Sequence, residues 1–369
     1  MVDPVALTQE LIRYDTVNPP GRERECAMHL ADLLDAGGFE TRLVELPGGH
    51  RASLIARHGR GSGKPLVFTG HIDVVPLGTR AWSRDPFGGE IAGGRIHGRG
   101  SSDMKSGVAA FVAAALQAAS RGADKEIVLI ITAGEETGCQ GAESIVAAGL
   151  QGEAGALVVC EPTGNAPFVG HKGALWLKAV LTGITAHGSM PERGDNAVYK
   201  AARAVNRLSC FHFGTPAHPV LGAPTLNVGS FHGGLNINSV PDRAEIEIDM
   251  RTTPGLDHGE LRERIRVHME EEARLETIVD LPGIWTAPED PWAASVAEIA
   301  AKVTGEPRAV KTATYFSDAS IFVPAMGGPP TLVLGPGEPA AAHQTDEWCS
   351  VERVRQAQAI YAEVINNWG

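Results

Sequence analysis

Apolar runs that stop abruptly at polar residues recur along the first half of the chain. Such runs predict buried strands at residues 53–57, 65–70, 126–136 and 156–164. Apolar positions at helical spacing predict helices within 4–37, and a run of small and apolar residues predicts a buried helix at 104–122. Because strands that alternate with helices form sheets covered on both faces, this part predicts a three-layer α/β domain.

The pattern changes near residue 172. From there to about 283 it predicts a strand, a helix, two strands and a further helix at 258–276. This order resembles a small open-faced α+β sandwich of the ferredoxin-like type. Beyond it the first pattern returns, with a helix at 291–304, a strand at 330–337 and a last helix from about 350. The sequence therefore predicts a discontinuous domain, residues 1–172 and 284–369, with a mixed, mostly parallel sheet, and an inserted domain, residues 173–283.

Composition and charge narrow the class of protein. The 369 residues carry 44 acidic and 32 basic side chains, a formal net charge of −12, which argues against a nucleic-acid or anionic-membrane partner. No segment approaches the ~18 consecutive apolar residues of a membrane span. The first residues are amphipathic and acidic at Asp3, unlike a secretory signal, and the five cysteines lack CxxC spacing. We therefore expect a cytoplasmic protein with reduced thiols.

Polar side chains stand at or near the ends of three of the predicted strands. His71 and Asp73 follow the strand at 65–70, Glu135 and Glu136 end the strand at 126–136, and Glu161 lies in the strand at 156–164. In sheets of this kind, sites collect beyond the carboxyl ends of the strands. Taken singly, each residue also has an ordinary explanation, such as a hydrogen-bonded core histidine or a solvated turn.

Two further residues, Asp103 before a predicted helix and His343 in an Ala/Gly/Pro-rich segment, complete a set of histidines and carboxylates. Asp103 alone would also suit a helix N-cap. Together the set suits zinc, which binds imidazole nitrogen and carboxylate oxygen. Two metals ~3.5–4 Å apart need a bridging ligand, and a carboxylate such as Asp103 can provide it. Of the neighbours Glu135 and Glu136, one can bind metal while the other stays free as a base.

These residues stand in short blocks that occur in a fixed order along the chain. The blocks are GHIDVVP (70–76), GRGSSDMKSG (98–107), AGEETG (133–138), CEPT (160–163), AHGSMP (186–191) and GPGEPAAAHQTDE (335–347). With them the chain resembles, nearly end to end, the dinuclear zinc amidohydrolases. That family includes acetylornithine deacetylase, succinyl-diaminopimelate desuccinylase, aminoacylase and glutamate carboxypeptidase.

The resemblance implies two Zn²⁺ per subunit, with Co²⁺ or Mn²⁺ as substitutes. Asp103 would bridge the two metals, and the peptide after it would be cis. Asp73 would orient His71, and Glu135 would be the general base that later protonates the leaving amine. The implied ligands are His71, Asp103 and Glu161 for one metal, and Asp103, Glu136 and His343 for the other.

For the inserted domain the resemblance implies a lid or dimerisation role, and a homodimer. His187 would stabilise the oxyanion, often in the active site of the other subunit, and Arg251 would grip a substrate carboxylate. Asn238 matches a family asparagine that binds substrate, although Asn236 fits equally well. The ordinary alternatives are a hydrogen-bonded loop histidine for His187 and a salt-bridged strand arginine for Arg251.

The predicted activity is hydrolysis of the amide bond of an N-acyl amino acid by a hydroxide that bridges the metals. The blocks at 82–89 and 160–165 favour an acetylornithine deacetylase-like enzyme, whereas the stretch 311–322 lacks the Gly-rich block of the desuccinylase branch. Ser317 and Asp318 in this stretch lie where relatives approach the substrate, and a helix N-cap explains them equally well. A dipeptidase or carboxypeptidase, and the desuccinylase, remain alternatives. A non-catalytic member is disfavoured because every ligand position and both glutamates are present.

Overall fold

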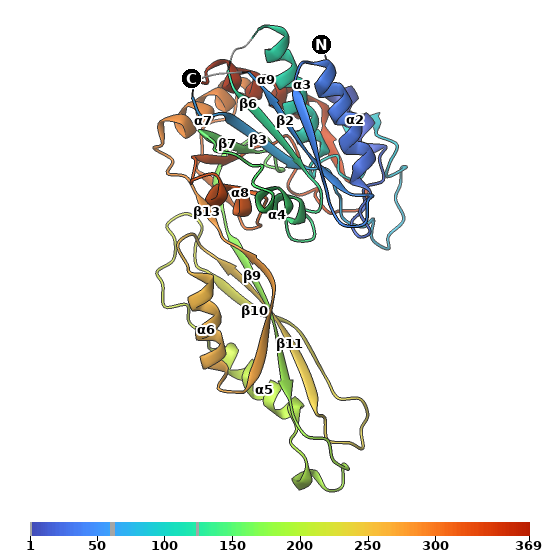
Figure 1. The fold of residues 1–369 in the computed structure, drawn as a ribbon, viewed down its shortest axis with the longest axis vertical. Coiled ribbons are helices and arrows are strands. Elements are labelled where there is room, and N and C mark those ends of the chain that lie inside the picture. Colours follow the sequence, from blue (N-terminus) through green and yellow to red (C-terminus); the bar gives the residue numbers. More distant parts are fainter. Residues whose placement is uncertain (1, 60–62, 123–124) are drawn as a thin grey trace. The chain divides into compact units, whose positions relative to one another are not determined.

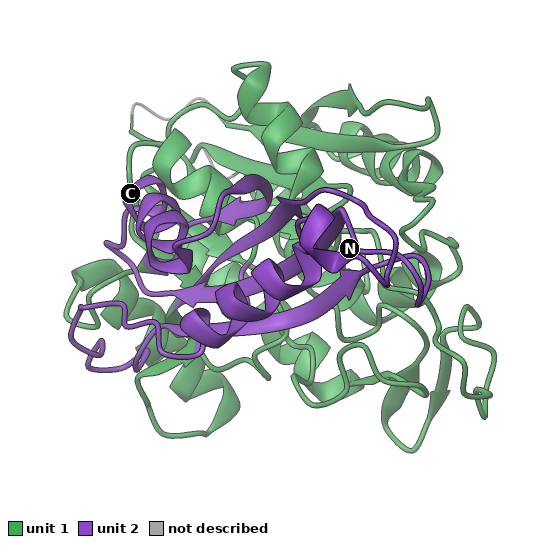
Figure 2. Cartoon of the chain, turned by 90° about the horizontal axis from the view of Figure 1, so that it is seen from below, with its two compact units in different colours: residues 1–170, 285–312, 317–369 green, residues 171–284, 313–316 purple. Residues whose placement is uncertain are grey.

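The structure, a computed structural model, describes residues 2–59, 63–122 and 125–369 (Figure 1). The chain divides into two compact units, which Figure 2 colours separately. Unit 1 comprises residues 1–170, 285–312 and 317–369, and unit 2 comprises residues 171–284 and 313–316. The boundaries expected from the sequence stood at 172/173 and 283/284. The segment 313–316, expected in the first domain, groups with unit 2 because the Lys172 N–H donates to the Ala313 carbonyl and the Phe316 ring packs edge-on against Trp176.

A mixed sheet forms the centre of unit 1, which confirms the predicted fold class. Its strands follow the order β1 (Glu40–Glu45), β2 (Ala52–His58), β6 (Ile127–Thr132), β3 (Leu66–His71), β7 (Ala156–Val159), β15 (Thr331–Val333), β8 (Phe168–His171) and β13 (Ile284–Trp285), and β14 (Lys311–Ala313) pairs with β8. The four strands β6, β3, β7 and β15 are parallel, whereas β1, β2 and β8 pair antiparallel.

The parallel strands are buried along their whole length, as the uninterrupted apolar runs predict. Residues on one face of the sheet, including Phe68, Leu129 and Val158, share a core with side chains of the covering helices. These helices are α1 (Pro4–Ile12), α2 (Glu23–Ala36), α3 (Lys105–Ser120), α7 (Pro291–Thr304) and α9 (Val351–Asn366). The shorter helices α4 (Gln140–Ala147) and α8 (Ala319–Ala325) contact each other, and Figure 1 shows them on the opposite side of the sheet. A small antiparallel sheet adds β4 (Glu90–Ala92), β5 (Arg95–His97) and β16 (Trp348–Ser350).

Unit 2 is an open-faced sandwich, as predicted. Its antiparallel sheet has the order β10 (Thr225–Gly233), β11 (Arg243–Thr252), β9 (Gly173–Thr182) and β12 (Ala273–Leu281). Alternate residues of β11 point into the core, where they meet the apolar faces of α5 (Ala197–Leu208) and α6 (His258–Met269). In the described part of the chain, no helix is both long and apolar enough to cross a membrane.

One element of unit 2 differs from the prediction. The helix expected at 258–276 ends at Met269, and residues 273–281 form β12, which pairs with β9. Glu270 adopts a left-handed conformation with φ 51°, which ends the helix. Beyond it Ala273 and Leu275 pack on the core with the two-residue spacing of a strand. The run of glutamates before them hides this spacing in the sequence.

Candidate metal centre

The sheet of unit 1 brings the polar ends of its parallel strands to one edge. His71 at the end of β3 lies in register with Thr132 at the end of β6, and Thr69 lies in register with Val159 of β7. The residues that follow β6 and β7 therefore emerge beside His71. Close packing adds α3 to this edge. A Cβ on Gly107 would lie 2.3 Å from the Cys160 carbonyl oxygen, so only glycine permits this approach.

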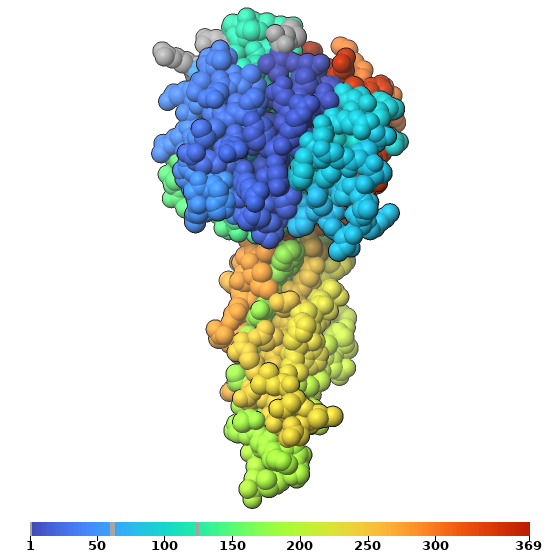
Figure 3. Space-filling model, turned by 90° about the vertical axis from the view of Figure 1, so that its right-hand side faces the viewer, coloured from blue at the N-terminus to red at the C-terminus, as the bar shows by residue number. Residues whose placement is uncertain are grey.

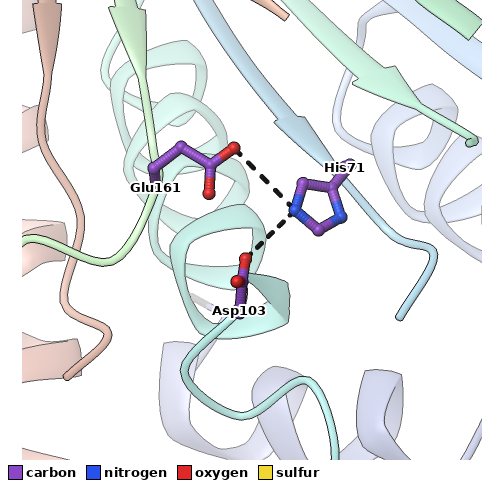
Figure 4. Close-up of side chains that lie close together, drawn as sticks. All are labelled: His71, Asp103 and Glu161. Atoms are coloured by element: carbon purple, nitrogen blue, oxygen red, sulfur yellow. Dashed lines mark hydrogen bonds and ion pairs between the residues drawn. The ribbon is translucent and has the colours of Figure 1, made fainter. Parts of the chain in front are cut away.

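A first group of donors consists of His71, Asp103 and Glu161, whose ligand atoms lie within 4.8 Å of one another. Figure 4 shows these side chains pointing toward a common centre from the end of β3, from the segment before α3 and from the segment after β7. The His71 Nε2 atom is 3.1 Å from Asp103 Oδ1 and 3.8 Å from Glu161 Oε1. His71 and Glu161 are buried, so a bound ion would be largely shielded from water.

A second group shares Asp103 and adds Glu136 and His343. The His343 Nε2 atom lies 3.2 Å from Asp103 Oδ2 and 3.1 Å from Glu136 Oε1. Asp103 thus faces the first group with one carboxylate oxygen and the second group with the other, the arrangement expected of a bridging ligand. The peptide between Asp103 and Met104 is cis, as the resemblance implied.

Asp73 orients the His71 ring through its backbone carbonyl, whereas its position in the sequence suggested the carboxylate. The His71 Nδ1–H donates to the backbone carbonyl of Asp73 at 2.9 Å, and the Asp73 carboxylate is farther away at 3.5 Å. This hydrogen bond leaves Nε2 to face Asp103. The Asp73 carboxylate instead accepts the backbone N–H groups of Glu135 and Glu136 at 3.1 and 3.2 Å, and so fixes the turn that carries both glutamates.

Glu135 and Glu136 point in different directions, as expected of neighbours. Glu136 belongs to the second donor group, whereas Glu135 belongs to neither. The Glu135 Oε2 atom nevertheless lies 4.0 Å from His71 Nε2, and the side chain is buried. Glu135 therefore lies beside the donor groups without belonging to either.

The site concentrates negative charge in a buried place. Burial raises the pKa of Glu135 well above its usual value, and the Glu161 and Glu136 carboxylates raise it further, although His71 opposes them. Glu161 behaves alike: burial raises its pKa, and Asp103 adds to the effect. Hydrogen bonds to Asp103 and Glu136 raise the pKa of His343 to about 10. Because unpaired buried carboxylates are costly, this cluster suits a binder of divalent cations.

Residues 67–367 match the family described as Peptidase family M20/M25/M40. The chain belongs to this family. It is 33% identical over 387 residues to a succinyl-diaminopimelate desuccinylase of Cereibacter sphaeroides (strain ATCC 17029 / ATH 2.4.9), covering 100% of this chain and 99% of the relative. It is 30% identical over 355 residues to an acetylornithine deacetylase of Edwardsiella ictaluri (strain 93-146), covering 92% of this chain and 89% of the relative. The fold matches a solved M20 family metallo-carboxypeptidase of Sulfolobus solfataricus with a TM-score of 0.81 at 20% identity, covering 99% of both chains.

This M20 protein is therefore an amidohydrolase that acts on small amide substrates. Its donor groups fit the metals implied for the family. Each group offers one imidazole nitrogen and two carboxylates, a chemistry that suits zinc, and the two groups share one carboxylate.

Two residues of this M20 enzyme that hold Asp103 and Asp73 in place were not predicted from the sequence. Glu347 is fully buried and accepts the backbone N–H groups of Ser102 and Asp103 at 2.7 and 3.0 Å, together with a 2.6 Å ion pair from Arg99. Asn18 donates to the Asp73 carboxylate at 2.9 Å. Glu347 lies in the block 335–347 that carries His343, and this was the one signal in the sequence that pointed to it.

The residues of unit 2 with an expected role are His187 as a catalytic residue and Arg251 and Asn238 as substrate-binding residues. His187 is exposed and contacts Ser189 Oγ at 2.8 Å, and the N–H of Gly188 donates to the Asn238 carbonyl, so His187 and Asn238 lie on adjacent loops. Arg251, at the end of β11, pairs with Asp249 at 3.0 Å and lies over the Trp176 ring. The roles of all three stay predictions.

The loop that joins β10 and β11 lies at the surface of unit 2, in yellow in Figure 3. Two of its apolar side chains, Leu235 and Ile237, are almost fully exposed. The same loop carries Asn236, which lines a cavity of about 510 Å³ in this unit, and Asn238. The geometry thus leaves both asparagines available as candidates for substrate binding.

Proposed function

We propose that this M20 enzyme hydrolyses the amide bond of an N-acyl amino acid with a free α-carboxylate, with two Zn²⁺ as the metals. Co²⁺ or Mn²⁺ would substitute for zinc. The observation that supports the proposal is that the carboxylates differ in which donor group they belong to. Asp103 belongs to both donor groups, Glu136 and Glu161 each belong to one, and Glu135 belongs to neither while lying 4.0 Å from His71 Nε2.

In this proposal His71, Asp103 and Glu161 would hold one metal, and Asp103, Glu136 and His343 would hold the other. When bound, the two cations supply Lewis acidity that polarises the scissile carbonyl and makes a water molecule more acidic. Glu135 accepts a proton from that water on Oε2, the oxygen nearer His71, and then protonates the leaving nitrogen. Its burial supports this role, because burial raises the pKa of Glu135 toward the range of a useful acid and base.

Residues of unit 2 complete the proposed reaction. His187 donates a hydrogen bond to the developing oxyanion, from either subunit of a homodimer. Arg251 binds the α-carboxylate of the substrate, a planar ion that matches the guanidinium fork. Arg251 pairs with Asp249 and lies over the Trp176 ring, and the salt-bridge alternative predicts this pair as well. Asn238 adds a polar contact to the substrate.

The acyl group is the finer part of the proposal, and deacetylation is our first candidate. The blocks at 82–89 and 160–165 favour it, and a relative named acetylornithine deacetylase aligns over 92% of this chain. Desuccinylation is a second candidate, because a relative named succinyl-diaminopimelate desuccinylase aligns over the whole chain at 33% identity. Hydrolysis of a dipeptide is a third, which the fold shared with an M20 metallo-carboxypeptidase leaves open.

A substrate panel tests these candidates with one assay of amine release. N-acetyl and N-succinyl derivatives of ornithine and diaminopimelate are compared with dipeptides, each with a free or an amidated α-carboxylate. We expect the N-acetyl amino acids with a free carboxylate to give the highest kcat/KM. A preference for succinyl groups or for dipeptides would replace the first candidate by the second or third. Hydrolysis that survives EDTA would contradict metal dependence itself.

A further inference from the structure

A cysteine thiol lies against the carboxylate that we assign as the base. The Cys139 Sγ atom is 3.9 Å from Glu135 Oε1, and the cysteine is fully buried. A tight turn creates this contact, because the N–H groups of Gly138 and Cys139 both donate to the Glu135 carbonyl, at 2.9 and 3.0 Å. Cys139 has a left-handed backbone with φ 61°, rare for a residue with a side chain, so the turn holds the thiol in a defined place.

A second buried carboxylate also acts on this thiol. Asp318, just before α8, is buried and accepts the Thr132 hydroxyl at 2.5 Å through Oδ2. Asp318 is the N-cap residue of α8, but its side chain makes no capping hydrogen bond and instead takes part in a hydrogen bond with the Cys139 thiol. Burial raises the pKa of the Cys139 thiol well above its usual value, and the charges of Asp318 and Glu135 raise it further. The thiol therefore keeps its proton at neutral pH and acts as a hydrogen-bond donor.

The two oxygens of Glu135 consequently have different surroundings. Oε1 faces the thiol, while Oε2 lies 4.0 Å from His71 Nε2. We propose that Cys139 is a positioning residue, whose thiol donates to Oε1 of Glu135 and so presents Oε2 to the metal centre. This proposal rests on the proposed function of Glu135 as the base. The Thr132–Asp318 bond ties the start of α8 to the end of β6 and fixes Asp318 beside the thiol, where its carboxylate is a second acceptor for the single S–H proton.

Substitution of the thiol tests its effect on turnover. In Cys139→Ala the Glu135 carboxylate loses a donor, and we expect kcat to fall about tenfold with KM and zinc content unchanged. Cys139→Ser keeps a donor on a shorter bond and should recover part of the lost kcat. The matched control is Cys26→Ala, which removes another fully buried thiol, from α2, and should leave kcat near the wild-type value. Wild-type kcat in Cys139→Ala would overturn the proposal, and so would a loss of kcat that follows loss of zinc.

Infrared spectroscopy tests the hydrogen bond without any turnover. The spectrum of the metal-free wild type minus that of Cys139→Ala isolates the S–H stretching band of Cys139. In Glu135→Gln this band should move to higher frequency, because an amide is a weaker acceptor than a carboxylate. An unmoved band would overturn the proposal. Turnover by zinc-loaded Glu135→Gln would instead refute the role of Glu135 as base and leave the band result intact, so the two failures are distinguishable.

Discussion

Glu347 is expected to hold the Asp103 segment in place, although it lies outside both donor groups. Its Oε1 atom accepts the N–H groups of Ser102 and Asp103, and its Oε2 atom accepts the Gly100 N–H and the Arg99 guanidinium, at 2.6–3.0 Å. Glu347→Gln keeps the shape of the side chain but replaces one acceptor oxygen by an NH₂ donor. Whichever way the amide turns, it then faces two donors, and the buried Arg99 loses its counter-charge.

The magnitude follows from these contacts. Two hydrogen bonds to a charged acceptor are lost, each worth about 1.5–3 kcal/mol, and breaking a buried ion pair costs about 3–5 kcal/mol. These terms describe the same atoms and are not added, so we expect the free energy of unfolding of metal-free protein to fall by about 3–5 kcal/mol. Because Glu347 orients a shared metal ligand, zinc affinity should also fall about 10–100-fold.

Urea unfolding and competition with a zinc chelator measure these two quantities. The control is Glu338→Gln, since Glu338 forms a 2.7 Å pair with Arg353 in which both side chains are about 30% exposed (27% and 31%). A pair of this kind contributes at most about 1 kcal/mol. If Glu347→Gln destabilised the protein no more than Glu338→Gln and bound zinc with wild-type affinity, the role of Glu347 in holding the Asp103 segment would be refuted.

Three further predictions concern pH, substrate and subunits. The pKa of His343 is raised to about 10 in the folded, metal-free protein, so protonated His343 stabilises the fold fully below its unfolded-state pKa of 6.5 and this stabilisation is lost as the pH rises toward 10. A Tm of the metal-free protein that does not fall between these pH values would contradict this. Arg251→Ala should raise KM about 10–100-fold for substrates with a free α-carboxylate and leave KM for amidated substrates unchanged. Equal effects on both kinds of substrate would refute the assignment of Arg251 to the carboxylate. If His187 acts across a dimer, inactive His187→Ala and Glu135→Ala chains should regain activity when their subunits are mixed; no recovery after proven mixing would place His187 in its own subunit or outside the reaction.

The two donor groups of unit 1 could be predicted because the signal of most of their residues is local. His71, Glu136 and Glu161 each follow a buried run, and parallel strands carry such residues to one edge. The assignment of Asp103 as the shared residue came from the family blocks rather than from periodicity. The two carboxylate oxygens of Asp103 face different donor groups, and this geometry is compatible with a bridging ligand.

The supporting contacts could not be predicted, because they join residues that are far apart in the sequence. Asn18 is 55 positions from Asp73, and Glu347 is 244 positions from Asp103. Neither spacing leaves a periodic trace. The end of α6 was missed for a different reason: the glutamates before β12 fit a solvated helix equally well, and only packing on the core of unit 2 makes 273–281 a strand.

In our proposal Glu135 transfers protons beside two metals that it does not bind. The most direct test measures the zinc content and the turnover of Glu135→Gln in the same sample. We expect two Zn²⁺ per chain, as in the wild type, and a rate at least about 10³-fold lower. A variant that binds both metals and still turns over at a rate near that of the wild type would contradict it.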